Sequence, residues 1–426
     1  MGTQQMDQDH QRAAGAPATA LFMSAHRCIR ASGVAERISV PVDPDGRGDR
    51  HFQQCVAHAF SRARARGIAN PIVIGAIPFD TRQPSSLSIP LDYEIFEPAV
   101  PGVKSVPGAK SAPGATSAAA AAPGPRAPLI VSARSLPDAD RFQQAVRQAI
   151  AHFQLSDIRK AVLSRILDVE LTENLDVGQV FARLTAQNPS GFHFRLPLAD
   201  GSELIGASPE LLVRKDAGRI YSNPLAGSAK RRADSAQDRQ AGAALLESDK
   251  DIYEHRLVIE DIQRVLQPLC RQLDVPHYPA LLGTAAMWHL STRIEGVLAD
   301  PAMSALQLAC RLHPTPAVCG YPTGLARKLI SLLEPFERGL FAGLVGWCDA
   351  EGNGEWAVTI RCGRIDQNRI QLFAGAGIVA DSRPESEWAE TEAKLQTMLN
   401  ALGLALPAGE LLQSHQPHDA TAEAMA

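Results

Sequence analysis

The sequence lacks the features of disulfide-rich, zinc-binding and membrane proteins. Its cysteines are odd in number, widely scattered and without a CxxC pair, which predicts reduced thiols in a reducing compartment. No apolar run reaches the roughly 18 residues of a membrane span, and residues 1–17 show no charged-then-apolar signal pattern. We therefore expect a cytoplasmic protein with no membrane partner. The seven cysteines are Cys28, Cys55, Cys270, Cys310, Cys319, Cys348 and Cys362.

The sequence also lacks a strong charge of either sign. A net charge of -4 and a pI near 6.3 give no electrostatic reason to expect nucleic acid as a partner. An anionic substrate would therefore need a locally built basic site. With 45% hydrophobic and 21% charged residues, the chain is typical of a globular protein that buries a large core.

Composition divides the chain unevenly. Residues 1–18 read as a flexible start, and residues 405–426 as a disordered polar tail. Residues 99–128 consist almost entirely of Ala, Pro, Gly, Ser and Val, with the near repeat VPGVKS, VPGAKS, APGATS. Such a stretch buries too little apolar surface to order itself, so we interpret it as a disordered insertion. Length alone favours two or three domains.

Several strands are expected from alternating or continuous apolar patterns. Residues 71–77 are strand-like, and residues 159–169 alternate with Lys160 on the face of Val162 and Ser164. Residues 355–365 alternate too, which predicts one strand with Arg361 on it. A further strand at 369–373 ends in Ala374-Gly-Ala-Gly, where glycines allow backbone N–H groups to approach a ligand or simply permit a turn or bulge.

Two helices with acidic pairs are expected. An apolar stripe at helical spacing predicts a helix over 249–273 with Ser248 as its N-cap, and a second helix over about 385–402 is bounded by Pro384 and Gly403. Each helix presents two carboxylates three residues apart, on one face. If the helices meet across a cleft, these oxygens suit Mg²⁺; otherwise they complement the helix dipole in solvent. The pairs are Asp251 with Glu254, and Glu387 with Glu390.

Three further side chains are candidates for chemistry, each with an ordinary alternative. Lys160 on a half-apolar strand face is a desolvated base or a lysine snorkelling at a sheet edge. Glu210, just before a buried strand, is a general acid or a surface turn residue. Arg361 binds a substrate carboxylate or forms a structural ion pair. His255 is a weak zinc or di-iron candidate because no HExxH is present.

Ten stretches, in order, resemble the isochorismate synthases of siderophore pathways, within the wider chorismate-utilising family. The resemblance covers nearly everything except the insertion and the tail. The stretches are FMSAHR, NPIVIGAIPFD, KAVLSR, GASPELLVRK, NPLAGSAKR, DKDIYEHRLV, HPTPAVCGYP, GWCDAEGNGEWAVTIRCGRI, LFAGAGIV and EWAETEAKL.

The resemblance implies a single α+β domain over residues 19–404, interrupted by the insertion, with large antiparallel sheets packed centrally and helices outside. It implies that Lys160 activates water for attack at ring C2 of chorismate, and that Glu210 protonates the departing C4 hydroxyl. Glu254 and Glu390 match the family's Mg²⁺ ligands, supported by Asp251 and Glu387. It also implies substrate-binding positions, which are Gly227, Ser228, His289, Arg361, Gly375, Gly377 and Lys394.

A few positions distinguish members of the family. Lys160 favours water as the nucleophile, because the ammonia-using relatives lack a lysine base there, and Ala226 replaces a lysine of the aminodeoxychorismate synthases. Salicylate synthases typically have Thr and Tyr where this chain has Ala317 and Phe341. We therefore expect an enzyme that stops at isochorismate, feeding 2,3-dihydroxybenzoate or salicylate, and the resemblance also implies a monomer. A salicylate synthase and a non-catalytic chorismate-binding protein are the alternatives.

Overall fold

The computed structural model describes residues 19–43, 45–46, 48–96 and 129–405. The expected flexible start at 1–18 and the expected insertion at 99–128 lie outside the described residues. So does the expected tail, apart from Ala405.

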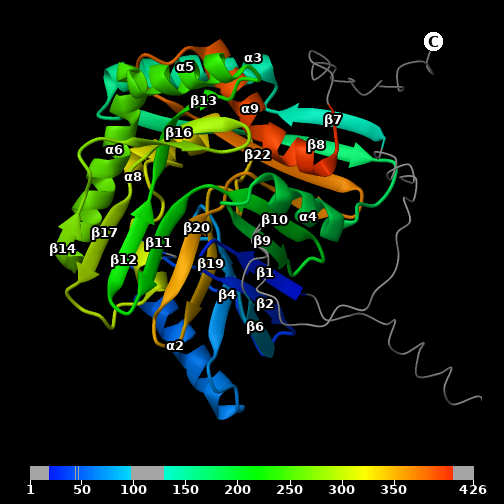
Figure 1. Cartoon of the computed structure of the whole chain (residues 1–426), viewed down its shortest axis with the longest axis vertical. Helices are drawn as coiled ribbons and strands as arrows, with labels where there is room; N and C mark the ends of the chain where they lie inside the picture. Colours follow the sequence, from blue (N-terminus) through cyan, green and yellow to red (C-terminus); the bar gives the residue numbers. More distant parts are fainter. Residues whose placement is uncertain (1–18, 44, 47, 97–128, 406–426) are drawn as a thin grey trace, which may run out of the picture.

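A ten-stranded antiparallel sheet forms one half of the centre (Figure 1). The long strand β8 lies near one end, between β22 on one side and both β18 and β7 on the other. In sheet order the strands are β18 (Gly320–Tyr321), β8 (Lys160–Leu171), β22 (Arg369–Ile378), β21 (Cys362–Asp366), β10 (Glu203–Ser208), β9 (Phe192–Pro197), β1 (Thr19–Met23), β2 (Cys28–Ser32) and β6 (Asp92–Phe96), with β7 (Ile130–Leu136) beside β8.

A nine-stranded antiparallel sheet forms the other half, and a three-stranded sheet lies beside the helices. The nine strands are, in sheet order, β14 (Cys270–Asp274), β17 (Ile294–Leu298), β12 (Arg219–Asn223), β11 (Leu211–Asp216), β20 (Gly354–Val358), β19 (Leu344–Asp349), β4 (Ile72–Ile77), β5 (Ser86–Ile89) and β3 (Glu36–Ile38). The small sheet has the order β13 (Leu225–Lys230), β16 (Met287–Ser291) and β15 (Ala280–Gly283).

The helices cover these sheets from outside, with α3, α5 and α9 gathered at the top of Figure 1 and α2 at the bottom. Helix α9 packs on β22 and α6 packs on β13, so the two acidic helices approach the same end of the sheets. The helices are α2 (Arg50–Ala65), α3 (Ala139–Leu155), α4 (Val177–Gln187), α5 (Ser235–Leu246), α6 (Asp249–Leu266), the short η1 (Gln267–Leu269), α7 (Ala305–Leu312), α8 (Thr323–Leu333) and α9 (Pro384–Leu402).

Apolar side chains from both large sheets form one extensive core. Trp356 of β20 lies fully buried in it, and Val358 on the same strand is equally enclosed. Because central antiparallel sheets carry the helices on their outer sides, the expected α+β class is confirmed.

The expected single strand over 355–365 is wrong. The chain leaves the nine-stranded sheet after Val358 and joins the ten-stranded sheet at Cys362. Arg361 sits in the corner between them with φ 51°, in the left-handed region, which costs a non-glycine residue about 1–3 kcal/mol. All of β20 is buried, so the alternating residue pattern there does not distinguish a solvent face from a core face. The pattern therefore does not reveal where the strand ends.

Two other expected boundaries are wrong. Helix α6 stops at Leu266 instead of 273, because Pro268 lacks the N–H that a continuing helix needs, and the chain turns into strand β14. Strand β22 continues to Ile378 instead of ending at Phe373, so its glycines lie inside a paired strand. By contrast, the N-cap at Ser248 and the expected ends of α9 are confirmed.

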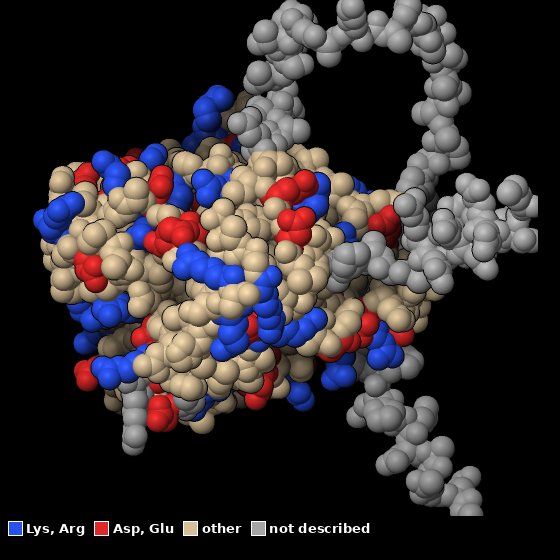
Figure 2. Space-filling model, turned by 90° about the horizontal axis from the view of Figure 1, so that it is seen from below, with Lys and Arg blue, Asp and Glu red and all other residues tan. Residues whose placement is uncertain are grey.

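Charges of both signs share the face drawn in Figure 2, where a group of Lys and Arg side chains lies near the centre with Asp and Glu around it. All seven cysteines are free. Among the described residues, no helix combines the length and apolar character that crossing a membrane requires.

Candidate active site

The site begins where β8 and β22 run side by side. Lys160 opens β8, and its side chain is 0% exposed. Gly377, paired with Val162, lies beside it, and a Cβ at Gly377 would overlap the Glu254 carboxylate and approach the Lys160 side chain. The glycine therefore makes room for an acid and an amine to meet over the strand.

The Lys160 amine has a charge partner but an incomplete set of hydrogen bonds. Its Nζ lies 2.9 Å from Oε1 of Glu254, yet in an orientation that gives it no hydrogen-bond acceptor among the described residues. A buried amine normally has its donors satisfied. The Lys160 amine therefore has hydrogen-bonding capacity left for a bound molecule.

Glu210 is a second buried ionisable group. It lies between β10 and β11 and is 3% exposed, so the surface-turn alternative is excluded. Burial raises the pKa of Glu210 to about 7, although the Leu225 N–H and the charge of Lys160 act in the opposite direction. A carboxyl group with that pKa can donate a proton near neutral pH.

Arg361 and His289 form the third part of the site. Both are buried, and Nη2 of Arg361 lies 3.5 Å from Nε2 of His289. Burial, with the charges of Arg361 and Lys394, holds the pKa of His289 well below its usual range, so the ring is neutral and can accept from the guanidinium. Burial also lowers the pKa of Arg361 to about 10, which leaves it charged at neutral pH. Arg361 has no ion-pair partner among the described residues, so its structural alternative is disfavoured.

The two acidic helices meet at their first turns. Lys250 of α6 donates to Oε1 of Glu387 on α9 at 2.8 Å. Burial, and then the charge of Glu390, raise the pKa of Glu387 to about 7. Burial also raises the pKa of Asp251, with Glu254 and Glu390 adding to it. These carboxylates therefore repel one another within a shared buried region instead of facing solvent.

The small sheet and α9 complete this side. Gly227 is the extra residue of a bulge in β13, with φ +77°, and a Cβ there would lie 3.0 Å from Cβ of Asp251. The Ser228 hydroxyl hydrogen-bonds Glu390, and Lys394 pairs with Glu390 at 2.5 Å. Lys394 also donates to the Gly375 carbonyl at 2.8 Å, which joins α9 to β22.

The two positions that distinguish the family members lie beside β22 and β8. Phe341 is buried and stacks on Phe373 of β22, with ring centroids 5.1 Å apart. Ala317 lies in the loop before β18, whose Cys319 carbonyl accepts from the Val162 N–H at 2.9 Å. Phe341 therefore packs against β22, the strand that contains Gly375 and Gly377, and Ala317 lies in the loop beside β8.

Sequence reasoning missed Lys250 and the pair Glu334–Arg338. A lysine between two aspartates at a helix start opposes the helix dipole, which was a usable signal. No sequence signal marks the other pair. Glu334 accepts from the Ser164 N–H and Arg338 donates to the Val162 carbonyl, both at 2.7 Å, so two side chains fill the edge of β8 between its neighbours β18 and β7.

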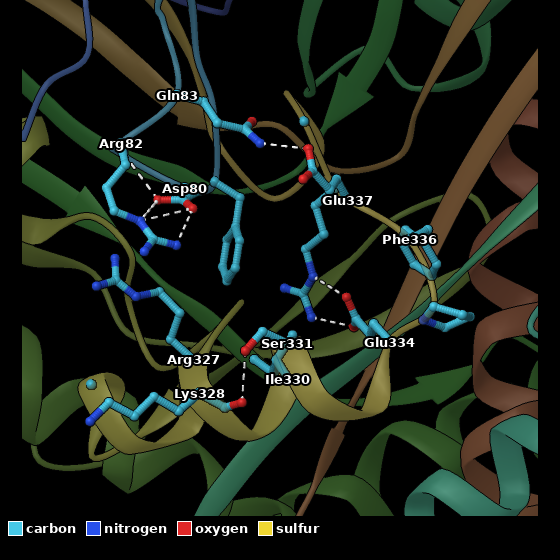
Figure 3. A pocket seen from close by; sticks show the side chains of 15 residues that line it. Asp80, Arg82, Gln83, Arg327, Lys328, Ile330, Ser331, Glu334, Phe336 and Glu337 are labelled. Carbon is cyan, nitrogen blue, oxygen red and sulfur yellow. Dashed lines mark hydrogen bonds and ion pairs between the residues drawn. The ribbon is translucent and has the colours of Figure 1, made fainter. Parts of the chain in front are cut away.

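The same ion pair lines a pocket of about 550 Å³ beside α8 (Figure 3). Asp80 pairs with Arg82, Gln83 donates to Glu337, and the Ser331 hydroxyl donates to the Lys328 carbonyl in the same pocket. None of the expected site residues lines this pocket. It is therefore separate from the buried cluster around Lys160.

The carboxylates fit a hard divalent cation better than zinc. A lysine pairs with each of Glu254, Glu387 and Glu390, and a cation would offset the charge of Glu390, which together with burial raises the pKa of Glu387. Within the described ranges, no group of three Asp, Glu, His or Cys side chains is placed to hold a metal ion. Mg²⁺ does not require such a group, since it keeps waters and takes few protein carboxylates. His255 is not available, because Ala226 and Thr292 occupy both ring nitrogens.

These features define an α+β enzyme whose ionisable groups are buried between sheets and helices. The chain matches the family described as chorismate binding enzyme over residues 111–403. It is 46% identical over 389 residues to the isochorismate synthase EntC of Escherichia coli K12, covering 91% of this chain and 96% of that protein. It is 38% identical over 364 residues to the vibriobactin-specific isochorismate synthase of Vibrio cholerae, covering 83% and 87%.

A solved structure agrees with these relatives. The crystal structure of DhbC from Bacillus anthracis superposes with a TM-score of 0.82 at 37% identity, covering 94% of this chain and 100% of that chain. The chain therefore belongs to the chorismate-binding enzyme family.

Proposed function

We propose that this protein is an isochorismate synthase, which converts chorismate to isochorismate. The observation that carries the proposal is the fully buried Lys160 amine, without a hydrogen-bond acceptor among the described residues, in a site that also contains a carboxyl group with a pKa of about 7. An amine that accepts a proton and an acid that donates one are the two groups that this displacement requires.

In the proposed reaction, the Lys160 amine takes a proton from water as the water oxygen bonds to ring C2. The ring double bonds shift, and the C4 hydroxyl leaves as water with a proton from Glu210. Lys160 ends protonated and Glu210 ionised, so a proton returns between them before the next turnover. No redox change occurs, and water is both consumed and released.

The substrate carboxylates need cations and backbone donors. Arg361, with backbone groups at Gly375 and Gly377, is assigned to the enolpyruvyl carboxylate, and the neutral His289 beside it orients the guanidinium. Gly227, Ser228 and Lys394 are assigned to the side of the ring carboxylate.

We assign the metal site to Glu254 and Glu390, with Asp251 and Glu387 supporting them. When bound, Mg²⁺ supplies a positive charge that anchors the ring carboxylate. Lys250 pairs with Glu387 and Lys394 pairs with Glu390, and these ion pairs reduce the repulsion between the two carboxylates.

Incubation of the purified protein with chorismate and Mg²⁺ tests the proposal. We expect isochorismate to accumulate, and chromatography identifies it. Salicylate and pyruvate formed without a partner enzyme would show a salicylate synthase instead, and no turnover would favour a non-catalytic chorismate-binding protein. Ala317 and Phe341 support the first outcome, since salicylate synthases typically carry Thr and Tyr there.

The similarity to a vibriobactin-specific enzyme supports a role in siderophore biosynthesis, through 2,3-dihydroxybenzoate or salicylate. We further propose a cytoplasmic monomer with chorismate as its small-molecule partner and no nucleic-acid or membrane partner. The free cysteines support a reducing compartment.

A further inference from the structure

Arg165 is a buried cation that forms no ion pair with any described residue. Its side chain is 0% exposed, and the charge of Glu392 on α9 acts on it without direct pairing. Burial lowers the pKa of Arg165 to about 10, so the group remains charged at neutral pH. Burying a charge without a paired anion costs free energy, so the neutral groups around the guanidinium must stabilise it.

Those contacts come mainly from α9. The guanidinium lies 3.8 Å from the centre of the Trp388 ring, and its Nε donates to Oγ1 of Thr391 at 2.7 Å. On the other side, Nη1 donates to Oγ of Ser135 on β7 at 2.9 Å, while Nη2 has no acceptor among the described residues. Arg165 therefore joins β8, β7 and α9 at one point.

The positions of Arg165 along β8 and of its partners along α9 relate this contact to the active site. In β8, Arg165 faces away from Lys160 and Ser164, because alternate residues point to opposite faces of a strand. On α9, Trp388 directly follows Glu387, and Thr391 directly follows Glu390. Successive helical residues point about 100° apart. The contact of Arg165 with Trp388 and Thr391 therefore also sets the direction in which Glu387 and Glu390 point.

We propose that Arg165 is a positioning residue that sets the rotation of α9 against β8, and so places Glu387 and Glu390 relative to Lys160. This inference rests on the proposed function for its consequence, which is Mg²⁺ binding. Its neutral partners hold the helix without adding another negative charge beside the four carboxylates.

The chain offers a matched pair of variants. Thr391 and Ser135 each accept one hydrogen bond from the same guanidinium, and each hydroxyl also donates to a nearby backbone carbonyl. Thr391→Val removes the contact on α9, and Ser135→Ala removes the contact on β7. A merely structural Arg165 predicts that both variants lose stability and that neither changes Mg²⁺ affinity selectively.

Isothermal titration with Mg²⁺ alone, on folded full-length protein, separates the two possibilities. We expect Thr391→Val to weaken Mg²⁺ binding about tenfold, as supporting residues around a metal typically do, and Ser135→Ala to change it less than about twofold. Equal Mg²⁺ affinities in the two variants would overturn the proposal. Urea unfolding of both variants measures the stability loss separately.

Crystal structures of the two variants test the geometry whether or not Mg²⁺ binds. We expect the Glu387 and Glu390 carboxylates to move relative to Lys160 only in Thr391→Val. Unmoved carboxylates would overturn the positioning role. A wild type that binds no Mg²⁺ would instead count against the metal assignment in the proposed function.

Discussion

Replacing Glu210 by Gln should raise stability at high pH while it removes activity. In the folded protein, burial raises the pKa of Glu210 from 4.5 to about 7. Between these two values the folded state holds a proton that the unfolded state has lost. The contribution of Glu210 to stability is therefore fully present below about pH 4.5 and is lost as the pH rises through about 7.

The size of this effect follows from the two pKa values. Their difference corresponds to about 3 kcal/mol, to an order of magnitude. Gln is neutral at every pH, so the variant avoids this loss. We expect the free energy of unfolding of Glu210→Gln, minus that of wild type, to increase by about 3 kcal/mol between about pH 4 and about pH 8.

Activity should change in the opposite direction. A general acid contributes about 10²–10⁴-fold, so Glu210→Gln should lose that factor in kcat. Wild-type kcat should fall about tenfold per pH unit above about pH 7, because Glu210 must be protonated to donate. Urea titrations followed by tryptophan fluorescence measure stability, and chromatography of the product measures kcat.

Glu355→Gln is the matched control. Glu355 is also a buried carboxyl group whose pKa burial raises, but it lies in β20, hydrogen-bonded to Ser24. For this variant too, the free energy of unfolding minus that of wild type should increase as the pH rises. Its profile of kcat against pH should be the same as that of wild type. A stability difference for Glu210→Gln that is independent of pH, or a variant with wild-type kcat, would exclude Glu210 as a buried general acid.

Three further variants test other parts of the site. Lys160→Met should fold and lose at least about 100-fold in kcat, and wild-type turnover by this variant would exclude Lys160 as the base. Glu254→Gln should raise the Mg²⁺ concentration for half-maximal activity by at least about tenfold, and an unchanged Mg²⁺ dependence would remove Glu254 from the metal site. Gly377→Ala should abolish turnover, because the added Cβ overlaps the Glu254 carboxylate. Gly324→Ala in α8 is the control: a Cβ there meets nothing within 4 Å, so kcat should be unchanged. Equal activities of the two variants would contradict this geometry.

Local patterns predicted the elements that hold the acids and the base. The strand of Lys160, the cap at Ser248 and the limits of α9 all follow from spacing within one segment. Those signals depend on periodicity and capping, which the sequence displays directly. The resemblance to known enzymes then supplied the roles that physics alone left open.

The features that escaped prediction depend on contacts between distant segments. Lys250 meets Glu387 across 137 positions, and Ser164 meets Glu334 across 170. The corner at Arg361 was also missed, since a chain that passes between two buried sheets keeps an apolar pattern on both sides of the turn. Such features are set by tertiary packing, which a single sequence does not display.

The fate of solvent oxygen tests the proposed reaction. In that reaction, water activated by Lys160 provides the new hydroxyl at ring C2. Isochorismate formed in water enriched in heavy oxygen should therefore carry one heavy oxygen atom at C2 by mass spectrometry. Unlabelled isochorismate would contradict the proposed reaction, because it would mean that the hydroxyl group moves within the substrate.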